Sequence, residues 1–152
     1  MTLQSLTDRQ GIRKQLIAAG LKATHQRIVI LETVIALHDK HPTAEGIHQY
    51  LTEANPGISL GTVYKTLDHL VEADLLKRVF SDNNRRYDLN GQAHSHIYCT
   101  NTHEIIDFAD PELEKLMMAF FSNKNFKNFS IRDISVQIVG TKIDPDENII
   151  IT

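Results

Sequence analysis

Four segments with helical spacing of apolar residues follow one another in the first 75 residues, and this arrangement limits the fold more than any other feature of the chain. Each segment has its own start signal, such as Thr43 after a proline or Ser59 before an apolar run. The turn Asn55-Pro56-Gly57 separates the third segment from the fourth. The sequence therefore predicts four helices, capped first at Thr7, over 7–19, 24–37, 43–54 and 59–74.

Two short strand patterns, 76–80 and 86–89, follow the fourth helix and are joined by a polar turn. Helix, turn, helix and β-hairpin is the order of elements in a winged helix-turn-helix. In that arrangement the helix 43–54 crosses the DNA backbone, and the helix 59–74 enters the major groove. The first 90 residues are therefore predicted to bind DNA.

The remaining residues have a different pattern, and we place the boundary at Asn90-Gly91-Gln92. Asp110-Pro111 begins a helix that extends to Ser122. Strands are predicted over 96–100, 104–108, 130–140 and 148–152. The predicted fold class is α+β, with a winged-helix domain over 1–90 and a small α/β domain over 91–152.

Composition excludes several classes of protein. A length of 152 residues, 41% hydrophobic residues and a net charge of −3 favour a folded globular chain over a disordered one. No run approaches the roughly 20 apolar residues of a membrane span, and no secretory signal pattern is visible. Cys99 is the only cysteine, which excludes an intramolecular disulfide and a four-cysteine zinc site. We therefore expect a cytoplasmic protein that has no membrane partner.

Charge is distributed unevenly along the chain. Residues 1–90 hold 11 Lys and Arg against 10 Asp and Glu, whereas residues 91–152 hold 5 against 9. A polyanion is therefore expected to contact the N-terminal half, with scattered surface charge as the alternative.

The polar face of the helix 59–74 carries the residues that we predict to contact DNA. An apolar stripe, assigned to the core, consists of Leu60, Val63, Leu67 and Leu70. Tyr64 lies at the border of that stripe, where its ring can pack while its edge reaches a thymine methyl or a phosphate. The predicted contacts are Ser59, Thr62, Tyr64 and Lys65. An ordinary amphipathic helix with a tyrosine at its border is the alternative.

Histidine and carboxylate side chains form a candidate metal site. His94 and His96 lie on one face of a predicted strand, because side chains alternate along a strand. A tight turn brings Asp107 back beside them, Asp88 ends the hairpin, and His41 completes the set from the N-terminal half. Nitrogen and oxygen ligands without a thiolate suit Fe²⁺, Mn²⁺ or Zn²⁺. Solvated surface histidines are the alternative.

Two other classes of function compete with a metal-dependent DNA-binding protein. His94, His96 and Asp107 have the composition of a two-histidine, one-carboxylate iron site in a metalloenzyme. That interpretation leaves the helix-turn-helix unexplained, so we predict that the protein is not an enzyme. The other class is a DNA-binding protein that needs no metal and whose histidines are incidental.

Five blocks of sequence resemble the ferric uptake regulator family, in the same order and with matching gaps, over residues 8–140. They read HPTAEGI at 41–47, GTVYKTL at 61–67, RYD at 86–88, HSHIYC at 94–99 and EIIDF at 104–108. The resemblance implies a homodimeric, metal-dependent repressor that binds a pseudo-palindromic operator in double-stranded DNA. It also implies that the domain over 91–152 serves dimerisation and metal sensing.

The resemblance assigns roles to individual residues. The regulatory metal site falls on His41, Asp88, His94, His96 and Asp107. The implied cofactor is Fe²⁺ or Mn²⁺, and Zn²⁺ can substitute in purified protein. Tyr64 matches the family's base-contacting tyrosine, and Arg27 matches an arginine that contacts the DNA backbone.

Departures from the family pattern also carry information. The family usually has two Cys-x-x-Cys pairs that hold a structural zinc, where this chain reads CTNT at 99–102 and TKID at 141–144. We therefore expect no structural zinc. A further family metal site would need ligands where Ala93, Ser95 and Ile134 stand, so no second metal is expected.

The carboxylates distinguish branches of the family. Iron-responsive members tend to carry glutamate at the positions of Asp88 and Asp107, whereas peroxide-sensing members resemble this chain in carrying aspartate at both. The resemblance therefore favours a peroxide-sensing repressor. An iron-responsive repressor that does not sense peroxide is the alternative.

Overall fold

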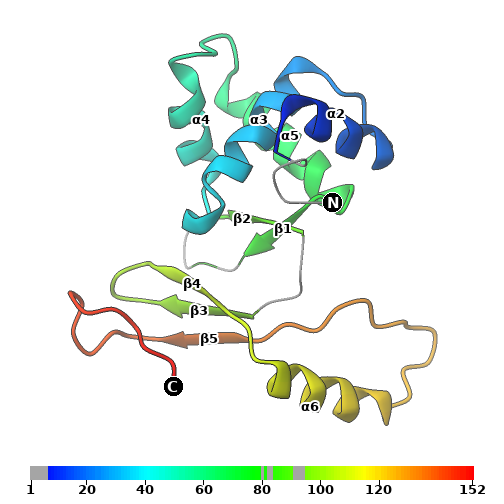
Figure 1. Ribbon diagram of the computed structural model, residues 1–152, viewed down its shortest axis with the longest axis vertical. Helices are drawn as coiled ribbons and strands as arrows, with labels where there is room; N and C mark the ends of the chain where they lie inside the picture. The colour runs from blue at the N-terminus through cyan, green and yellow to red at the C-terminus, as the bar shows by residue number, and fades with distance from the viewer. Residues whose placement is uncertain (1–6, 80, 82–83, 91–94) are drawn as a thin grey trace. The chain divides into compact units, whose positions relative to one another are not determined.

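The computed structural model describes residues 7–79, 81, 84–90 and 95–152, and divides the chain into two compact units, 1–90 and 91–152 (Figure 1). Helices fill most of the first unit, and a small sheet and one helix form the second. This is the predicted α+β fold class, which is thereby confirmed. Among the described residues, no helix is long and apolar enough to cross a membrane.

The first unit is a helical bundle followed by a hairpin. Its helices are α2 (Arg9–Ala18), α3 (His25–Ala36), the 3₁₀ turn η1 (His38–Lys40), α4 (Ala44–Thr52) and α5 (Leu60–Glu72). Thr24, Thr43 and Ser59 cap α3, α4 and α5, because each hydroxyl accepts a hydrogen bond from the amide three residues later. Each hydroxyl thus satisfies one of the backbone amides that have no partner at the start of a helix. Both partners lie within four residues, so the start of each helix could be predicted from the sequence.

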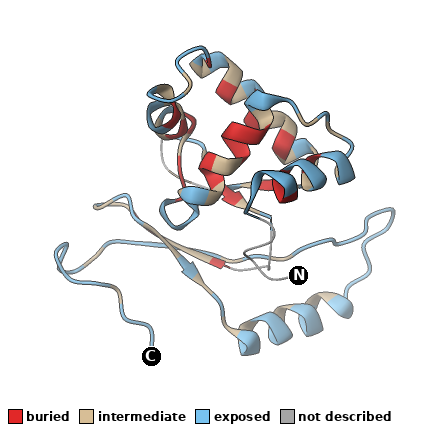
Figure 2. Ribbon diagram, turned by 45° about the horizontal axis from the view of Figure 1, so that its top comes forward, coloured by how far each residue is buried: buried red, intermediate tan, exposed pale blue. Residues whose placement is uncertain are grey.

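The core of the first unit lies between α2, α3, α4 and α5, where buried residues gather in Figure 2. Val63, Leu67 and Leu70 of α5 are completely buried, and Leu60 packs at the edge of the same cluster. Burying an aliphatic side chain of this size stabilises a fold by about 1.5–3 kcal/mol. The apolar stripe predicted for α5 therefore does face the core.

The hairpin after α5 is the wing of the winged helix. Strands β1 (Leu76–Val79) and β2 (Arg86–Leu89) pair antiparallel, with Leu76 opposite Leu89. Tyr87 is completely buried, and its amide donates to the carbonyl of Pro42 over 3.0 Å. An isolated bridge between Thr43 and Arg86 continues this contact, so β2 fixes the segment that precedes α4.

Residues 95–152 of the second unit form a three-stranded sheet of order β4-β3-β5 and one helix. Its elements are β3 (Ser95–Cys99), β4 (Ile105–Phe108), α6 (Pro111–Ser122) and β5 (Gln137–Gly140). Strand β3 pairs antiparallel with β4 and parallel with β5. Every residue of α6 is exposed or half-buried, although the helix carries Leu116, Met118 and Phe120 (Figure 2). The apolar face of α6 is thus not covered by its own unit.

Three sequence predictions about elements were wrong. The first helix is capped by Asp8 rather than Thr7, because the Asp8 carboxylate accepts from the Gly11 amide at 2.6 Å. The predicted strand 130–140 is a strand only over 137–140, where it lies beside β3. The described part of β3 begins at Ser95, beside Val136, so alternation predicted a buried face for residues that pair with no described strand. In the described tail, 148–152 is not a strand.

Candidate metal centre and DNA-reading surface

A histidine and an aspartate of the first unit form a buried pair. His41 ends the 3₁₀ turn with a φ of 45°, a left-handed conformation that is uncommon for a residue with a side chain. Its Nε2 lies 3.7 Å from Oδ2 of Asp88, and both residues are buried. The other carboxylate oxygen of Asp88 accepts from the Leu89 amide at 2.8 Å. That bond orients Oδ2 toward His41.

Backbone contacts bring these two residues together from distant parts of the sequence. The hydrogen bond from the Tyr87 amide to the Pro42 carbonyl places β2 alongside residues 41–43. Arg86 adds a side-chain bond of 3.2 Å from its guanidinium to the His41 carbonyl. Strain in a sparsely populated backbone region is maintained only where neighbours hold it, and it clusters at functional sites. His41 is held in this conformation by its neighbours on β2, and it lies at the candidate metal site.

A second histidine–aspartate pair lies in the second unit. His96 of β3 and Asp107 of β4 are direct cross-strand partners. His96 Nε2 lies 3.3 Å from Asp107 Oδ1, with side chains that are 15% and 50% exposed. The tight turn between β3 and β4 creates this register, as predicted from the spacing. His94, the other predicted histidine of this strand, lies outside the described residues.

The separation within each pair is close to that of two ligands on one metal ion. Two donor atoms bound to one ion at about 2.1 Å each lie roughly 3.0–3.5 Å apart at tetrahedral or octahedral angles. The observed 3.3 Å for His96 and Asp107 falls in that range. The 3.7 Å between His41 and Asp88 is too long for a direct hydrogen bond and slightly above the range. Imidazole nitrogen and carboxylate oxygen are the donors expected for Fe²⁺, Mn²⁺ or Zn²⁺, so the residues fit the ion that the family resemblance implies.

The predicted DNA-reading residues lie at the N-terminal part of α5. Ser59 is the exposed cap of the helix, Thr62 bonds to it, and Lys65 is exposed. The Tyr64 hydroxyl donates to the carboxylate of Glu45, which stands in the first turn of α4. This hydrogen bond raises the pKa of Tyr64 and lowers the pKa of Glu45. Because the hydroxyl proton is committed to Glu45, the oxygen of Tyr64 is left as an acceptor, and its contact with DNA stays a prediction.

Arg27 is also held in place. Its guanidinium donates to the Lys22 carbonyl at 3.0 Å and lies 3.5 Å from Nδ1 of His69 on α5. These contacts fix the arginine at the junction of α3 and α5 in the first unit. Its role toward the DNA backbone stays a prediction.

Sequence reasoning missed one polar contact of this surface. Asp68, on the outer face of α5, accepts a 2.6 Å bond from Arg78 of β1, and Arg85 lies 3.9 Å away. The bond raises the pKa of Arg78. The pattern shows only an exposed aspartate on a helix and basic residues in a hairpin, and no spacing rule links them. The contact ties the wing to α5.

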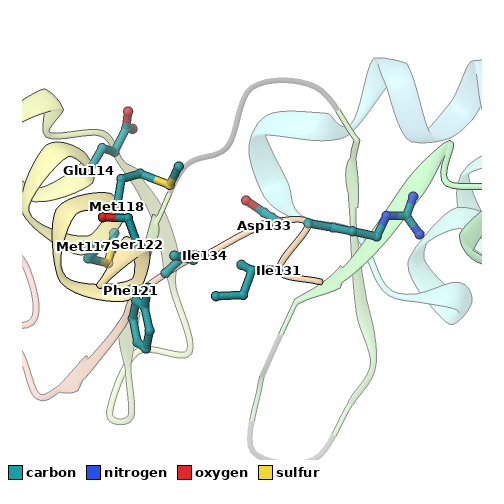
Figure 3. A pocket seen from close by; sticks show the side chains of 9 residues that line it. Glu114, Met117, Met118, Phe121, Ser122, Ile131, Asp133 and Ile134 are labelled. Carbon is teal, nitrogen blue, oxygen red and sulfur yellow. The ribbon is translucent and has the colours of Figure 1, made fainter. Parts of the chain in front are cut away.

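The second unit contains an apolar cavity of about 320 Å³ between α6 and residues 131–134 (Figure 3). Met117, Met118 and Phe121 line it from α6, and Ile131 and Ile134 line it from the other side. Leu116 and Phe120, on the exposed part of α6, are 68% and 58% exposed. Apolar surface of this extent on one face is typical of an interaction surface.

Comparisons with known proteins agree with the resemblance. The peroxide-responsive repressor PerR of Staphylococcus aureus is 36% identical over 99 residues. That stretch is 64% of this chain and 66% of the relative, so it spans slightly less than two thirds of the relative's length. This similarity agrees with the predicted peroxide-sensing branch.

Solved structures of ferric uptake regulators also resemble this chain. The ferric uptake regulator of Pseudomonas aeruginosa with manganese has a TM-score of 0.77 at 30% identity, covering 88% of this chain and 98% of that one. The ferric uptake regulator of Francisella tularensis with iron has a TM-score of 0.69 at 27% identity, covering 84% and 96%. The model of the ferric uptake regulator family matches residues 18–138. The chain therefore belongs to the ferric uptake regulator family.

Proposed function

We propose that this protein is a metal-dependent transcriptional repressor that binds DNA as a homodimer and senses peroxide through Fe²⁺. The proposed metal ligands are His41, Asp88, His94, His96 and Asp107. The observation that carries the proposal is the presence of one histidine–aspartate pair in each unit, at separations close to those of ligands on one ion. Relatives described as peroxide-responsive repressors support the choice of signal.

The proposed regulation follows from the distribution of the ligands. His41 and Asp88 belong to the first unit, and His96 and Asp107 to the second. An ion bound by both pairs would restrict motion between the two units and so fix the spacing of the two α5 helices in a dimer. A ligand that binds one arrangement better shifts the population toward it. DNA affinity would then report whether the site is loaded.

The direct experiment compares DNA binding of apo, Mn²⁺-loaded and Fe²⁺-loaded protein before and after peroxide. The probe is a duplex selected from a random pool with the Mn²⁺-loaded protein. The proposal requires binding by both loaded forms and loss of binding by the Fe²⁺ form alone after peroxide. An iron-responsive repressor would keep its binding after peroxide, and a protein that needs no metal would bind equally well as apo protein.

Tyr64→Ala is expected to weaken binding to the selected duplex by about 1–3 kcal/mol, because a base-edge contact is lost. Binding to random DNA should change much less, because phosphate contacts dominate there. Tyr50, an exposed tyrosine on α4, provides the matched control. Tyr50→Ala should leave the ratio of specific to random binding unchanged. Equal ratios for both variants in a competition assay would reject α5 as the reading helix.

Leu116→Asp is expected to weaken the proposed homodimer by at least about 30-fold, because a charge replaces an apolar side chain that a second copy would bury. The side chain is 68% exposed in the single chain, so the substitution leaves the unit's own packing intact. Glu112→Gln, at the exposed start of α6, is the control. Sedimentation equilibrium measures both variants. An unchanged dissociation constant for Leu116→Asp would exclude α6 from the interface.

A further inference from the structure

The two segments in which the family usually carries zinc-binding cysteines lie next to each other in the second unit. Strands β3 and β5 are parallel and end together, with Cys99 opposite Gly140 (Figure 1). The segments 99–102 and 141–144 therefore leave the sheet at the same end, where both strands finish. They contain one cysteine and one carboxylate, Asp144, between them, whereas a structural zinc takes four ligands and threonine hydroxyls are not among them. The residues present do not fit a structural zinc.

The side chain of Asn101 joins the two segments instead. Its Nδ2 donates to the Lys142 carbonyl at 3.1 Å, and its Oδ1 accepts from the Lys142 amide at 3.1 Å. One amide side chain thus satisfies both backbone groups of a residue in the other segment, as a neighbouring strand would. The Thr100 amide donates to the Gly140 carbonyl at 2.8 Å directly before this contact. The two hydrogen bonds between the Asn101 side chain and the Lys142 backbone therefore continue the β3–β5 hydrogen bonding beyond the sheet.

An ion pair adds to this contact. The ammonium of Lys142 lies 2.6 Å from Oε2 of Glu104, and the Lys142 side chain is only 6% exposed. Thr102 donates to the same carboxylate oxygen at 2.9 Å. The bond with Lys142 is the main reason that the pKa of Glu104 is lowered, and the Thr102 bond is the next. Lysine is almost never this buried unless it is paired, so the arrangement is specific rather than incidental.

We infer that these four residues, Asn101, Thr102, Glu104 and Lys142, form a polar clamp that takes the place of a structural zinc in this chain. The clamp fastens the segment after β5 to the turn between β3 and β4, across 41 residues of sequence. The second unit consequently folds without metal and without thiolates. Cys99 is buried in β3 and contributes its thiol to no metal in this arrangement.

One consequence concerns sensing and rests on the proposed function. A zinc–thiolate site is itself open to oxidation, because the thiolate is the reactive form of cysteine. Without such a site, the fold of this unit does not depend on metal-bound thiolates that peroxide could oxidise. Peroxide sensing would then rest on the proposed His/Asp site rather than on loss of a zinc-held fold.

The first arm of the test removes metal from the unaltered protein. Protein dialysed against EDTA is expected to hold no zinc by elemental analysis and to keep a cooperative thermal unfolding transition and its far-UV circular dichroism. Zinc that survives the dialysis, or loss of the transition after it, would overturn the inference. This arm does not involve DNA, so its outcome is independent of whether the protein is a repressor.

The second arm tests the clamp itself in the metal-free protein. Lys142→Met should lower Tm by about 5–10 °C, because it leaves the half-exposed Glu104 carboxylate without its main partner and removes the bond that holds the buried ammonium. Lys127→Met, at an exposed lysine, is the matched control and should leave Tm unchanged. Glu104→Gln and Asn101→Ala should each lower Tm by a smaller amount of about 2–4 °C. They keep the test decisive if Lys142→Met fails to fold.

The ion pair also predicts coupling between its members. The double variant Lys142→Met/Glu104→Gln should lower Tm by less than the sum of the single variants, since the second change removes a contact that is already lost. Additive shifts, or a Tm of Lys142→Met equal to that of Lys127→Met, would show that the contact does not hold the segment in place.

Discussion

His96→Ala is expected to abolish metal-dependent binding to the selected duplex, with a loss of metal affinity of more than about 100-fold. Even outer partners of a metal ligand cost about 10–100-fold when they are removed, and His96 is proposed as a direct ligand. The substitution leaves Asp107 facing a cross-strand alanine, so the remaining ligands cannot restore the coordination number.

The control for this variant is His38→Gln, which changes an exposed histidine of the η1 turn. It should bind Mn²⁺ and the duplex as the parent protein does. Metal binding is measured by titration with Mn²⁺, and DNA binding by fluorescence anisotropy at fixed salt, since affinity for DNA depends strongly on salt. Retention of Mn²⁺-dependent DNA binding by His96→Ala would reject the proposed ligand set.

Mild peroxide is expected to inactivate the Fe²⁺-loaded protein by adding one oxygen atom to a ligand histidine, and to leave the Mn²⁺-loaded protein active. Fe²⁺ bound there would activate peroxide, which Mn²⁺ does not readily do. One oxygen of hydrogen peroxide would be added to an imidazole, which is oxidised by two electrons, and the other oxygen would leave as water. If the proposed ligand set is right, the nearest oxidisable side chains there are the imidazoles of His41, His94 and His96. Their aspartate neighbours are hard oxygen ligands that suit both ions.

Cys99 is the competing target, and the structure argues against it. The thiol is buried at 2% exposure, and the chain has no second cysteine to resolve a sulfenic acid into an intramolecular disulfide. Mass spectrometry of the treated protein locates the added oxygen. A gain on the peptide holding His41, or on the one holding His94 and His96, together with loss of DNA binding, supports the prediction. Oxidation confined to Cys99, or unchanged DNA binding, refutes it.

The Cys99→Ser variant separates the two explanations. It should lose DNA binding after peroxide at the same rate as the parent protein when loaded with Fe²⁺. Its Mn²⁺-loaded form should again resist. Protection by Cys99→Ser would assign the sensing reaction to the thiol, and the proposed chemistry at the histidines would be wrong.

Local features of the sequence determined most helices of this protein. Thr24, Thr43 and Ser59 cap their helices through bonds to amides three residues away, so a short window of sequence contains both partners. The facing pair His96 and Asp107 was equally predictable, because a tight turn between two strands fixes their register. The metal-ligand set as a whole stays a prediction, since His94 lies outside the described residues.

Tertiary structure decided the contacts whose partners are far apart in sequence. Tyr64 bonds to Glu45 over 19 residues, Arg78 to Asp68 over 10, and Asn101 to Lys142 over 41. No propensity or periodicity encodes such a pair, because each side chain obtains its partner only when separate elements pack. The same reason explains the failure at 130–136, where alternation predicted a strand but the described part of the neighbouring strand β3 begins only beside residue 136. Sequence alone thus determined the elements that local bonds stabilise, and packing determined which of their side chains meet.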